Sequence, residues 1–131
     1  MSDNAENDVG TVGWFDLTVP DAPALRDFYS AVVGWTSTEV PMGDYADFCM
    51  HPSADAPPVA GICHARGENA GLPPVWLMYI RVADLDASVA VCIASGGQIL
   101  VPPRSMGAYG WVAVIQDPAG AVVGLIGPFP A

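Results

Sequence analysis

The sequence predicts an α+β fold in which two tandem βαβββ modules form a curved mixed sheet around a central cup. The first observation is an internal repeat, because at an offset of 63 residues three pairs coincide: Asp21 with Asp84, Gly34 with Gly97 and Gly61 with Gly124. The second observation is that both halves show the same order of patterns: a strand, an Asp, a helix, a Gly and three strands. A repeat this long that occurs twice indicates two copies of one supersecondary unit, since a solenoid needs about three repeats or more.

The first module is predicted to begin with a strand at residues 13–19, where the sequence has a period of two. Asp21 is suited to cap a helix, and apolar residues recur at helical spacing from there until Gly34, which ends it. Turns rich in Pro and Gly then separate three predicted strands, at 35–40, 45–50 and 59–65.

The second module repeats this order. A strand is predicted at 75–82, and Asp84 caps a helix that ends at Gly96 and Gly97. Three strands complete the module, at 98–101, 110–116 and 121–126.

The predicted domain organisation is a disordered acidic leader at 1–10 followed by a single domain at 11–128. Within that domain the modules occupy 11–65 and 75–128, and a linker rich in Gly and Pro joins them at 66–74. We expect one domain because a single βαβββ unit has a sheet face that it cannot cover alone.

Composition excludes several classes of function. The 131 residues carry a formal net charge of −10, with no lysine and four arginines, so nucleic acid and anionic membranes would repel the chain. No stretch approaches the roughly 20 apolar residues that span a bilayer. The acidic start is unlike a secretory signal, and the three cysteines form no CxxC pair, so we expect a cytoplasmic protein.

Three segments resemble the vicinal oxygen chelate superfamily, the group of glyoxalase I, bleomycin-resistance proteins and extradiol dioxygenases. They are WFDLTVPDAPALRDFYSAVVGW, the corresponding segment of the second half, VWLMYIRVADLDASVAVCIASGG, and DPAGAVVGLIGP. The resemblance covers roughly residues 11–128. It implies the fold strongly and the activity weakly, because this superfamily hosts several chemistries.

The resemblance also implies where a metal would bind. In the metal-dependent members, ligands stand at four repeat-related strand positions, which here hold Trp14, Gly61, Leu77 and Gly124. None of these side chains can ligate a divalent ion, which needs oxygen, nitrogen or sulfur donors. We therefore expect no metal and no other cofactor, and no catalytic residue is predicted.

Other donors form no convincing metal site. Cys63 and His64 are adjacent, so on a strand they point to opposite faces. Cys49 and His51 share a face, but two ligands are a weak signal.

In this fold the helices cover one face of the sheet, and the other face lines the cup. Two apolar stripes should lie under the helices: Phe15, Leu17 and Val19, and Trp76, Met78, Ile80 and Val82. The predicted ligand-binding residues of the cup are Trp14, Asp16, Thr18, Gly61, Leu77, Tyr79, Arg81, Trp111 and Gly124. Aromatic walls with a few polar groups suit a small molecule. The alternative is a plugged cup in which Asp16 and Arg81 form an ion pair.

Three functions follow from these observations. The leading hypothesis is a metal-free small-molecule-binding protein of the glyoxalase/bleomycin-resistance type, which sequesters an aromatic or cationic compound. The first alternative is a glyoxalase- or dioxygenase-like enzyme with an atypical site, and the second is a structural or regulatory module with a self-filled cup. The expected partner is a small molecule, without nucleic acid or membrane, and the resemblance leaves a homodimer open.

Overall fold

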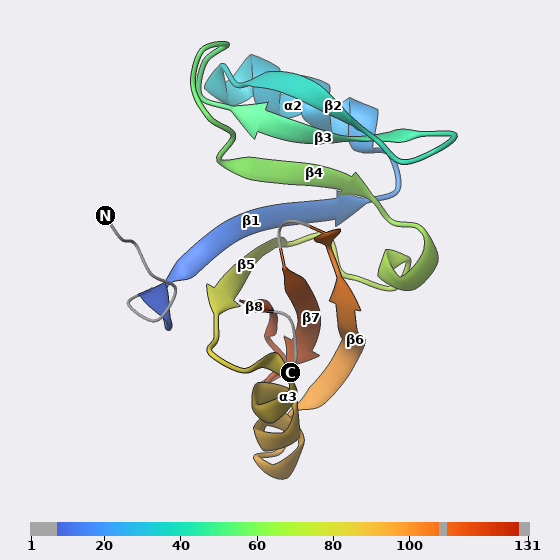
Figure 1. Ribbon diagram of the computed structural model, residues 1–131. Coiled ribbons are helices and arrows are strands. Elements are labelled where there is room, and N and C mark those ends of the chain that lie inside the picture. Colours follow the sequence, from blue (N-terminus) through green and yellow to red (C-terminus); the bar gives the residue numbers. More distant parts are fainter. Residues whose placement is uncertain (1–7, 108–109, 129–131) are drawn as a thin grey trace. The chain divides into compact units, whose positions relative to one another are not determined.

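The computed structural model describes residues 8–107 and 110–128, so most of the predicted leader at 1–10 lies outside the described residues. The chain divides into two compact units (Figure 1). We call Trp14–Trp76 the N-terminal unit, and Leu77–Ala131 together with Met1–Gly13 the C-terminal unit. Among the described residues, no helix is long and apolar enough to span a membrane.

The two units share one topology. The elements of the first are β1 (Val12–Val19), α2 (Ala22–Val33), β2 (Thr36–Pro41), β3 (Ala46–His51) and β4 (Ala60–His64). Its strand order is β2-β3-β4-β1, with β1 parallel to β4 and the other neighbours antiparallel. The elements of the second are β5 (Trp76–Arg81), α3 (Leu85–Ala94), β6 (Gln98–Ser105), β7 (Trp111–Gln116) and β8 (Val122–Gly127).

The C-terminal unit has the matching strand order β5-β8-β7-β6, again with only its first pair, β5 and β8, parallel. The predicted α+β class and the tandem βαβββ modules are therefore confirmed. The linker forms a short 3-10 helix, η1 (Gly67–Asn69). The shared cup and the single domain stay predictions.

Both helices begin at the predicted caps. The Asp21 carboxylate accepts a hydrogen bond from the backbone N–H of Ala24 at 3.2 Å, and the Asp84 carboxylate accepts one from Ala87 at 3.0 Å. Gly34 has a φ of 80° and ends α2 by donating its N–H to the Ser30 carbonyl, a backbone conformation that favours glycine. The two N-caps explain why the repeat is marked by Asp21 and Asp84. The C-terminal ends differ, because α3 ends at Ala94 with Ser95 as its C-cap, before the predicted Gly96 and Gly97.

Strand β6 runs four residues beyond the predicted end at residue 101. Pro102 and Pro103 suggested a break, but β6 lies at the edge of its sheet and pairs with β7 through register shifts on either side of Val101. Proline is tolerated on edge strands and at bulges, because no ladder hydrogen bond is lost there.

Each helix packs over the apolar face of its own sheet. In the N-terminal unit the buried cluster consists of Leu17, Val19, Ala22, Phe48, Met50 and Ile62. Tyr29, Trp35 and Trp76 pack against it, and the Trp76 indole N–H donates to the Tyr29 hydroxyl at 3.1 Å. In the C-terminal unit the cluster is Leu85, Ala113 and Leu125.

The expectation that Phe15 and Met78 are buried under the helices is wrong. Phe15 is 43% exposed and Met78 is 41% exposed, although Leu17 and Ile80 on the same strand faces pack into the cores. The reason is the path of the helices: α2 packs mainly over β2, β3 and β4, and α3 over β6, β7 and β8. Alternation along β1 and β5 identifies a strand face, but it does not show how much of that face a helix covers.

Candidate functional site

The N-terminal unit places Trp14, Asp16 and Gly61 together on the sheet face opposite α2. Asp16 on β1 is the register partner of Gly61 on the parallel strand β4. The Trp14 indole N–H donates to the Asp16 carboxylate at 2.6 Å. A Cβ atom on Gly61 would collide with a carboxylate oxygen of Asp16 and lie 3.4 Å from the indole nitrogen. The glycine is therefore what allows this pair to lie over β4.

The same face continues across β3 and β2 with polar side chains. Cys49 is the partner of Gly61, and Thr38 is the partner of Cys49, so a row runs Thr38–Cys49–Gly61–Asp16. Burial, and secondarily the nearby Asp16 carboxylate, raise the pKa of the Cys49 thiol above its ordinary value. Both effects disfavour the thiolate, so Cys49 is a neutral neighbour of Asp16 rather than an activated nucleophile.

His51 extends this face by one further hydrogen bond. Its Nδ1 lies 2.8 Å from the Ala56 carbonyl, and its Nε2 lies 3.0 Å from the Thr38 hydroxyl. Because a carbonyl only accepts, Nδ1 carries the proton, and Nε2 accepts from Thr38 when the ring is neutral. We call Trp14, Asp16, Thr38, Cys49 and His51 the polar face.

The C-terminal unit uses the matching glycine differently. Tyr79 is the register partner of Gly124. A Cβ atom on Gly124 would lie 2.5 Å from Cε2 and 2.7 Å from Cγ of the Tyr79 ring, so the ring lies flat against the glycine. The row continues through Val114 and Val101, which are both buried.

The structure thus brings together two groups of predicted residues: Trp14, Asp16 and Gly61 in one unit, and Tyr79 and Gly124 in the other. Gly61 and Gly124 were predicted as ligand-binding residues of the cup, where a residue without a side chain would leave space. Instead, the space beside each holds side chains of its own unit.

The other predicted residues are buried, bonded to another side chain or on the opposite face. Thr18 and Leu77 are buried, at 4% and 1% exposure. The Arg81 guanidinium donates to the Thr11 hydroxyl at 2.7 Å. Trp111 was expected on the same face as Tyr79, but it packs against the Leu85–Ala113–Leu125 cluster on the α3 face.

A divalent metal does not fit the four family positions. Trp14, Gly61, Leu77 and Gly124 offer no donor, and the volume beside each glycine is filled by Asp16 or Tyr79. Within residues 8–107 and 110–128, no three His, Cys, Asp or Glu side chains are grouped so as to hold an ion.

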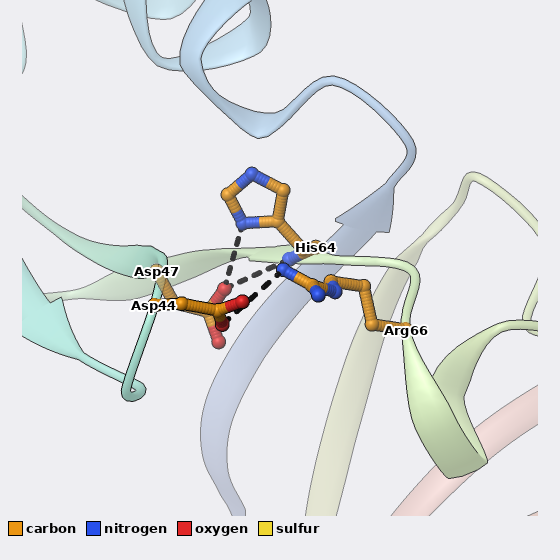
Figure 2. Close-up of polar contacts among 4 residues, drawn as sticks. All are labelled: Asp44, Asp47, His64 and Arg66. Atoms are coloured by element: carbon orange, nitrogen blue, oxygen red, sulfur yellow. Dashed lines mark hydrogen bonds and ion pairs between the residues drawn. The ribbon is translucent and has the colours of Figure 1, made fainter.

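A second polar cluster, which the sequence did not reveal, lies where β3 and β4 meet the turn before β3 (Figure 2). One Asp47 carboxylate oxygen accepts from the backbone N–H of His64 at 2.9 Å and lies 3.1 Å from its Nδ1. The Tyr45 ring meets the His64 ring edge-on at 5.0 Å, and the Arg66 guanidinium lies 4.0 Å above Tyr45. Arg66 also forms a long, exposed ion pair with Asp44 at 3.9 Å.

This cluster depends on strand register. Phe48 pairs with Ile62, which brings Asp47 close to His64 from 17 residues away in sequence. Sequence reasoning considered His64 only as a metal ligand beside Cys63. The available signal was the antiparallel pairing of the two predicted strands, whose register could not be fixed from the pattern alone.

The fold and the repeat-related glycine positions define a protein of the vicinal oxygen chelate type. Comparison agrees: the model of the Glyoxalase/Bleomycin resistance protein/Dioxygenase superfamily matches residues 11–125, and the chain belongs to this superfamily.

Similar proteins carry several different names. The candidate glyoxylase CFP32 of Mycobacterium bovis is 34% identical over 126 residues, which cover 95% of this chain and 48% of that protein. The anthracycline biosynthesis protein DnrV of Streptomyces peucetius is 32% identical, with 86% of this chain and 45% of that protein covered. The chain therefore spans about half the length of these curated relatives.

Solved structures share the fold at low sequence identity. Methylmalonyl-CoA epimerase from Mycobacterium tuberculosis matches with a TM-score of 0.55 at 19% identity, over 92% of this chain and 89% of that one. The Streptomyces coelicolor enzyme matches with a TM-score of 0.58 at 15% identity, over 92% and 98%. At such identities the likeness concerns the fold alone.

Proposed function

We propose that the chain is a metal-independent small-molecule-binding protein of its superfamily, and that the polar face of the N-terminal unit takes an aromatic, neutral or cationic compound. The observation that carries the proposal is the arrangement of Trp14, Asp16 and Gly61. At the family's ligand positions in this unit Trp14 and Gly61 offer no donor, and the Asp16 carboxylate beside β4 accepts the Trp14 indole N–H.

The chemistry of the polar face supports this ligand class. The Trp14 ring offers apolar and π contact, and the Asp16 carboxylate offers a charged acceptor that fixes orientation. The formal net charge of −10 attracts cations and repels anions over longer distances. Two relatives, DnrV and DauV, have names that refer to anthracycline biosynthesis, which is consistent with an aromatic small molecule.

The test has two parts. Elemental analysis measures bound metal, and a panel of small aromatic compounds is titrated in the presence of a chelator with tryptophan fluorescence as the readout. We expect no stoichiometric Zn, Fe, Ni or Mn after a chelator wash. At least one compound should bind, with weaker binding to the variants Trp14→Leu and Asp16→Asn. About one transition metal per chain retained after the wash, or binding that needs added metal, contradicts the proposal.

An acid–base enzyme is the second candidate, favoured by the contact between Asp47 and His64. A carboxylate that accepts from Nδ1–H fixes the tautomer of an imidazole and leaves Nε2 as a base. Turnover of a glyoxalase or epimerase substrate that is lost in His64→Gln, with the fold retained, would establish it.

A self-filled structural module is the third candidate, because Tyr79 lies against Gly124 and the Trp14–Asp16 pair lies against Gly61. Absence of binding across the panel would favour this reading.

The proposal includes a cytoplasmic homodimer that binds neither nucleic acid nor membrane. The net charge supports the absence of nucleic acid and membrane partners, and a reducing compartment is supported by Cys49, Cys63 and Cys92, which form no disulfide. Sedimentation of the purified chain at several concentrations tests the dimer.

A further inference from the structure

We propose that Asp16 selects the charge of the ligand. In the structure the Trp14 indole N–H occupies the site on Asp16 to which a hydrogen-bond donor of the ligand would bind. This inference rests on the proposed function. It assigns a specificity-determining role to Asp16 and a competing role to Trp14.

The geometry gives Asp16 a defined place. Its carboxylate accepts the indole N–H at 2.6 Å from two residues away on the same strand face, and Gly61 is the residue beneath it. Any larger residue at position 61 would displace this carboxylate. The backbone of β4 and the ring of Trp14 therefore fix the acceptor from two sides.

Exchange of donors explains the charge preference. The bond from the indole N–H to the Asp16 carboxylate is already charge-assisted, so a neutral ligand donor that replaces the indole gains about what it loses. A cationic donor adds the Coulombic attraction of its own charge for the carboxylate. An anionic ligand meets the carboxylate and gains nothing. A ligand with an aromatic ring and a cationic nitrogen also stacks against the displaced indole.

The neighbours of Asp16 are consistent with this role. Along the row lies the Cys49 thiol, whose pKa is raised by burial and by Asp16, so it adds no negative charge. Beyond it the Thr38 hydroxyl is bonded to Nε2 of His51. Asp16 shares this face with Asp47, two residues before Cys49 on β3, but the Asp47 carboxylate is bonded to His64, so Asp16 is the carboxylate beside Trp14 and Gly61.

The experiment compares three probes that share one ring and differ in head group: 1-naphthylmethylamine, 1-naphthalenemethanol and 1-naphthoate. Dissociation constants are measured by ligand-observed NMR with chelator present. The variants are Asp16→Asn, which removes the charge, and Trp14→Phe, which keeps a ring but removes the competing N–H. Matched controls are Asp27→Asn, on exposed helix surface, and Trp76→Phe, in the core of the same unit.

We expect the amine to bind the unaltered chain about tenfold or more tighter than the carboxylate, because one charged hydrogen bond is worth that much. Asp16→Asn should weaken the amine about tenfold and leave the alcohol within about twofold, while Trp14→Phe should tighten the amine severalfold. The controls should change neither.

Two results overturn the inference. Equal affinities for the three probes, or an Asp16→Asn variant that binds the amine normally, contradict charge selection by Asp16 and leave the proposed function standing. Failure of every probe, together with failure of the wider aromatic panel, contradicts both.

Discussion

The two units of this chain place a glycine at the same point of the same topology and cover it with different side chains. In the N-terminal unit the row across the sheet reads Thr38, Cys49, Gly61 and Asp16, whereas in the C-terminal unit it reads Val101, Val114, Gly124 and Tyr79. In the first row Thr38 is exposed, Cys49 and Asp16 are half-buried and only Gly61 is buried, whereas all four members of the second row are buried.

Under the proposed function the two repeats have separate tasks. The N-terminal unit keeps an acceptor, a thiol and a hydrogen-bonded histidine on one face, which suits recognition. The C-terminal unit fills the matching face with Val and Tyr, which suits stability. Superfamily membership predicts the backbone common to both, and only the individual side chains distinguish them.

The largest expected effects on stability concern the buried cluster under the helix of each unit. Ile62→Ala and Leu85→Ala, at 0% and 1% exposure, should each lower the free energy of unfolding by about 2–5 kcal/mol. The repeat mates Phe15→Ala and Met78→Ala should cost far less, because both are exposed. Urea denaturation of the four variants checks this, and equal losses at buried and exposed positions would show that the assignment of faces is wrong.

The second prediction concerns the two glycines. Gly124→Ala should destabilise by about 1–3 kcal/mol, because the new methyl group overlaps a buried ring. Gly61→Ala should cost less, since the Asp16 carboxylate is the end of a short side chain and can rotate away. Thermal unfolding compares them, with Tyr79→Leu/Gly124→Ala as the expected rescue. If Gly61→Ala is the more damaging change, the N-terminal row is the packed one.

The third prediction asks whether the polar contacts of the N-terminal unit hold its structure. Asp47→Ala removes both bonds to His64 and should cost about 1–3 kcal/mol. Asp44→Ala removes only an ion pair of 3.9 Å, whose carboxylate side chain is 82% exposed, and should be close to neutral. Equal unfolding midpoints for these two variants would mean that the His64 cluster contributes no stability.

Much of this architecture was predictable from the sequence, because caps and alternation are local signals. Asp21 and Gly34 mark a helix regardless of what packs on it, and the N-cap is repeated at Asp84, whereas α3 ends at Ala94 with Ser95 as its C-cap. Strand faces were largely right for the same reason. The extent of cover over Phe15 and the contact between Asp47 and His64 depend on helix path and strand register, which are tertiary properties.

The candidate site was predictable only in part. Alternation along β1 predicted that Trp14 and Asp16 share a strand face, and the structure places Gly61 beside them, while the shared cup stays a prediction. That the glycines are filled by Asp16 and Tyr79 could not be predicted, because alternation does not give a rotamer. Trp111 was assigned to the wrong face of its strand, because the sequence pattern alone did not show which residues of β7 face α3.

The fourth and smallest effect concerns the Cys49 thiol in a Cys63→Ala/Cys92→Ala background. Because burial and then Asp16 raise its pKa, less thiolate is present in the folded chain, and labelling by a disulfide reagent should be slower than in urea. Asp16→Asn should speed it about twofold.

The sign for stability follows from the same shift. A raised pKa in the folded state stabilises the fold below the pKa of the unfolded thiol, and this contribution is lost as the pH rises through the folded value. Labelling as fast in the folded as in the unfolded chain contradicts the burial of Cys49.

The most direct test of the central claim follows the indole N–H signals of the four tryptophans in ¹H–¹⁵N NMR spectra while 1-naphthylmethylamine is added in the presence of a chelator. Trp14→Phe identifies the signal that reports the bond to Asp16. The account predicts that this signal shifts with the probe concentration and that the same titration in Asp16→Asn leaves it nearly unchanged. A Trp14 signal that does not respond while the probe binds, or a response that requires added metal, would contradict it.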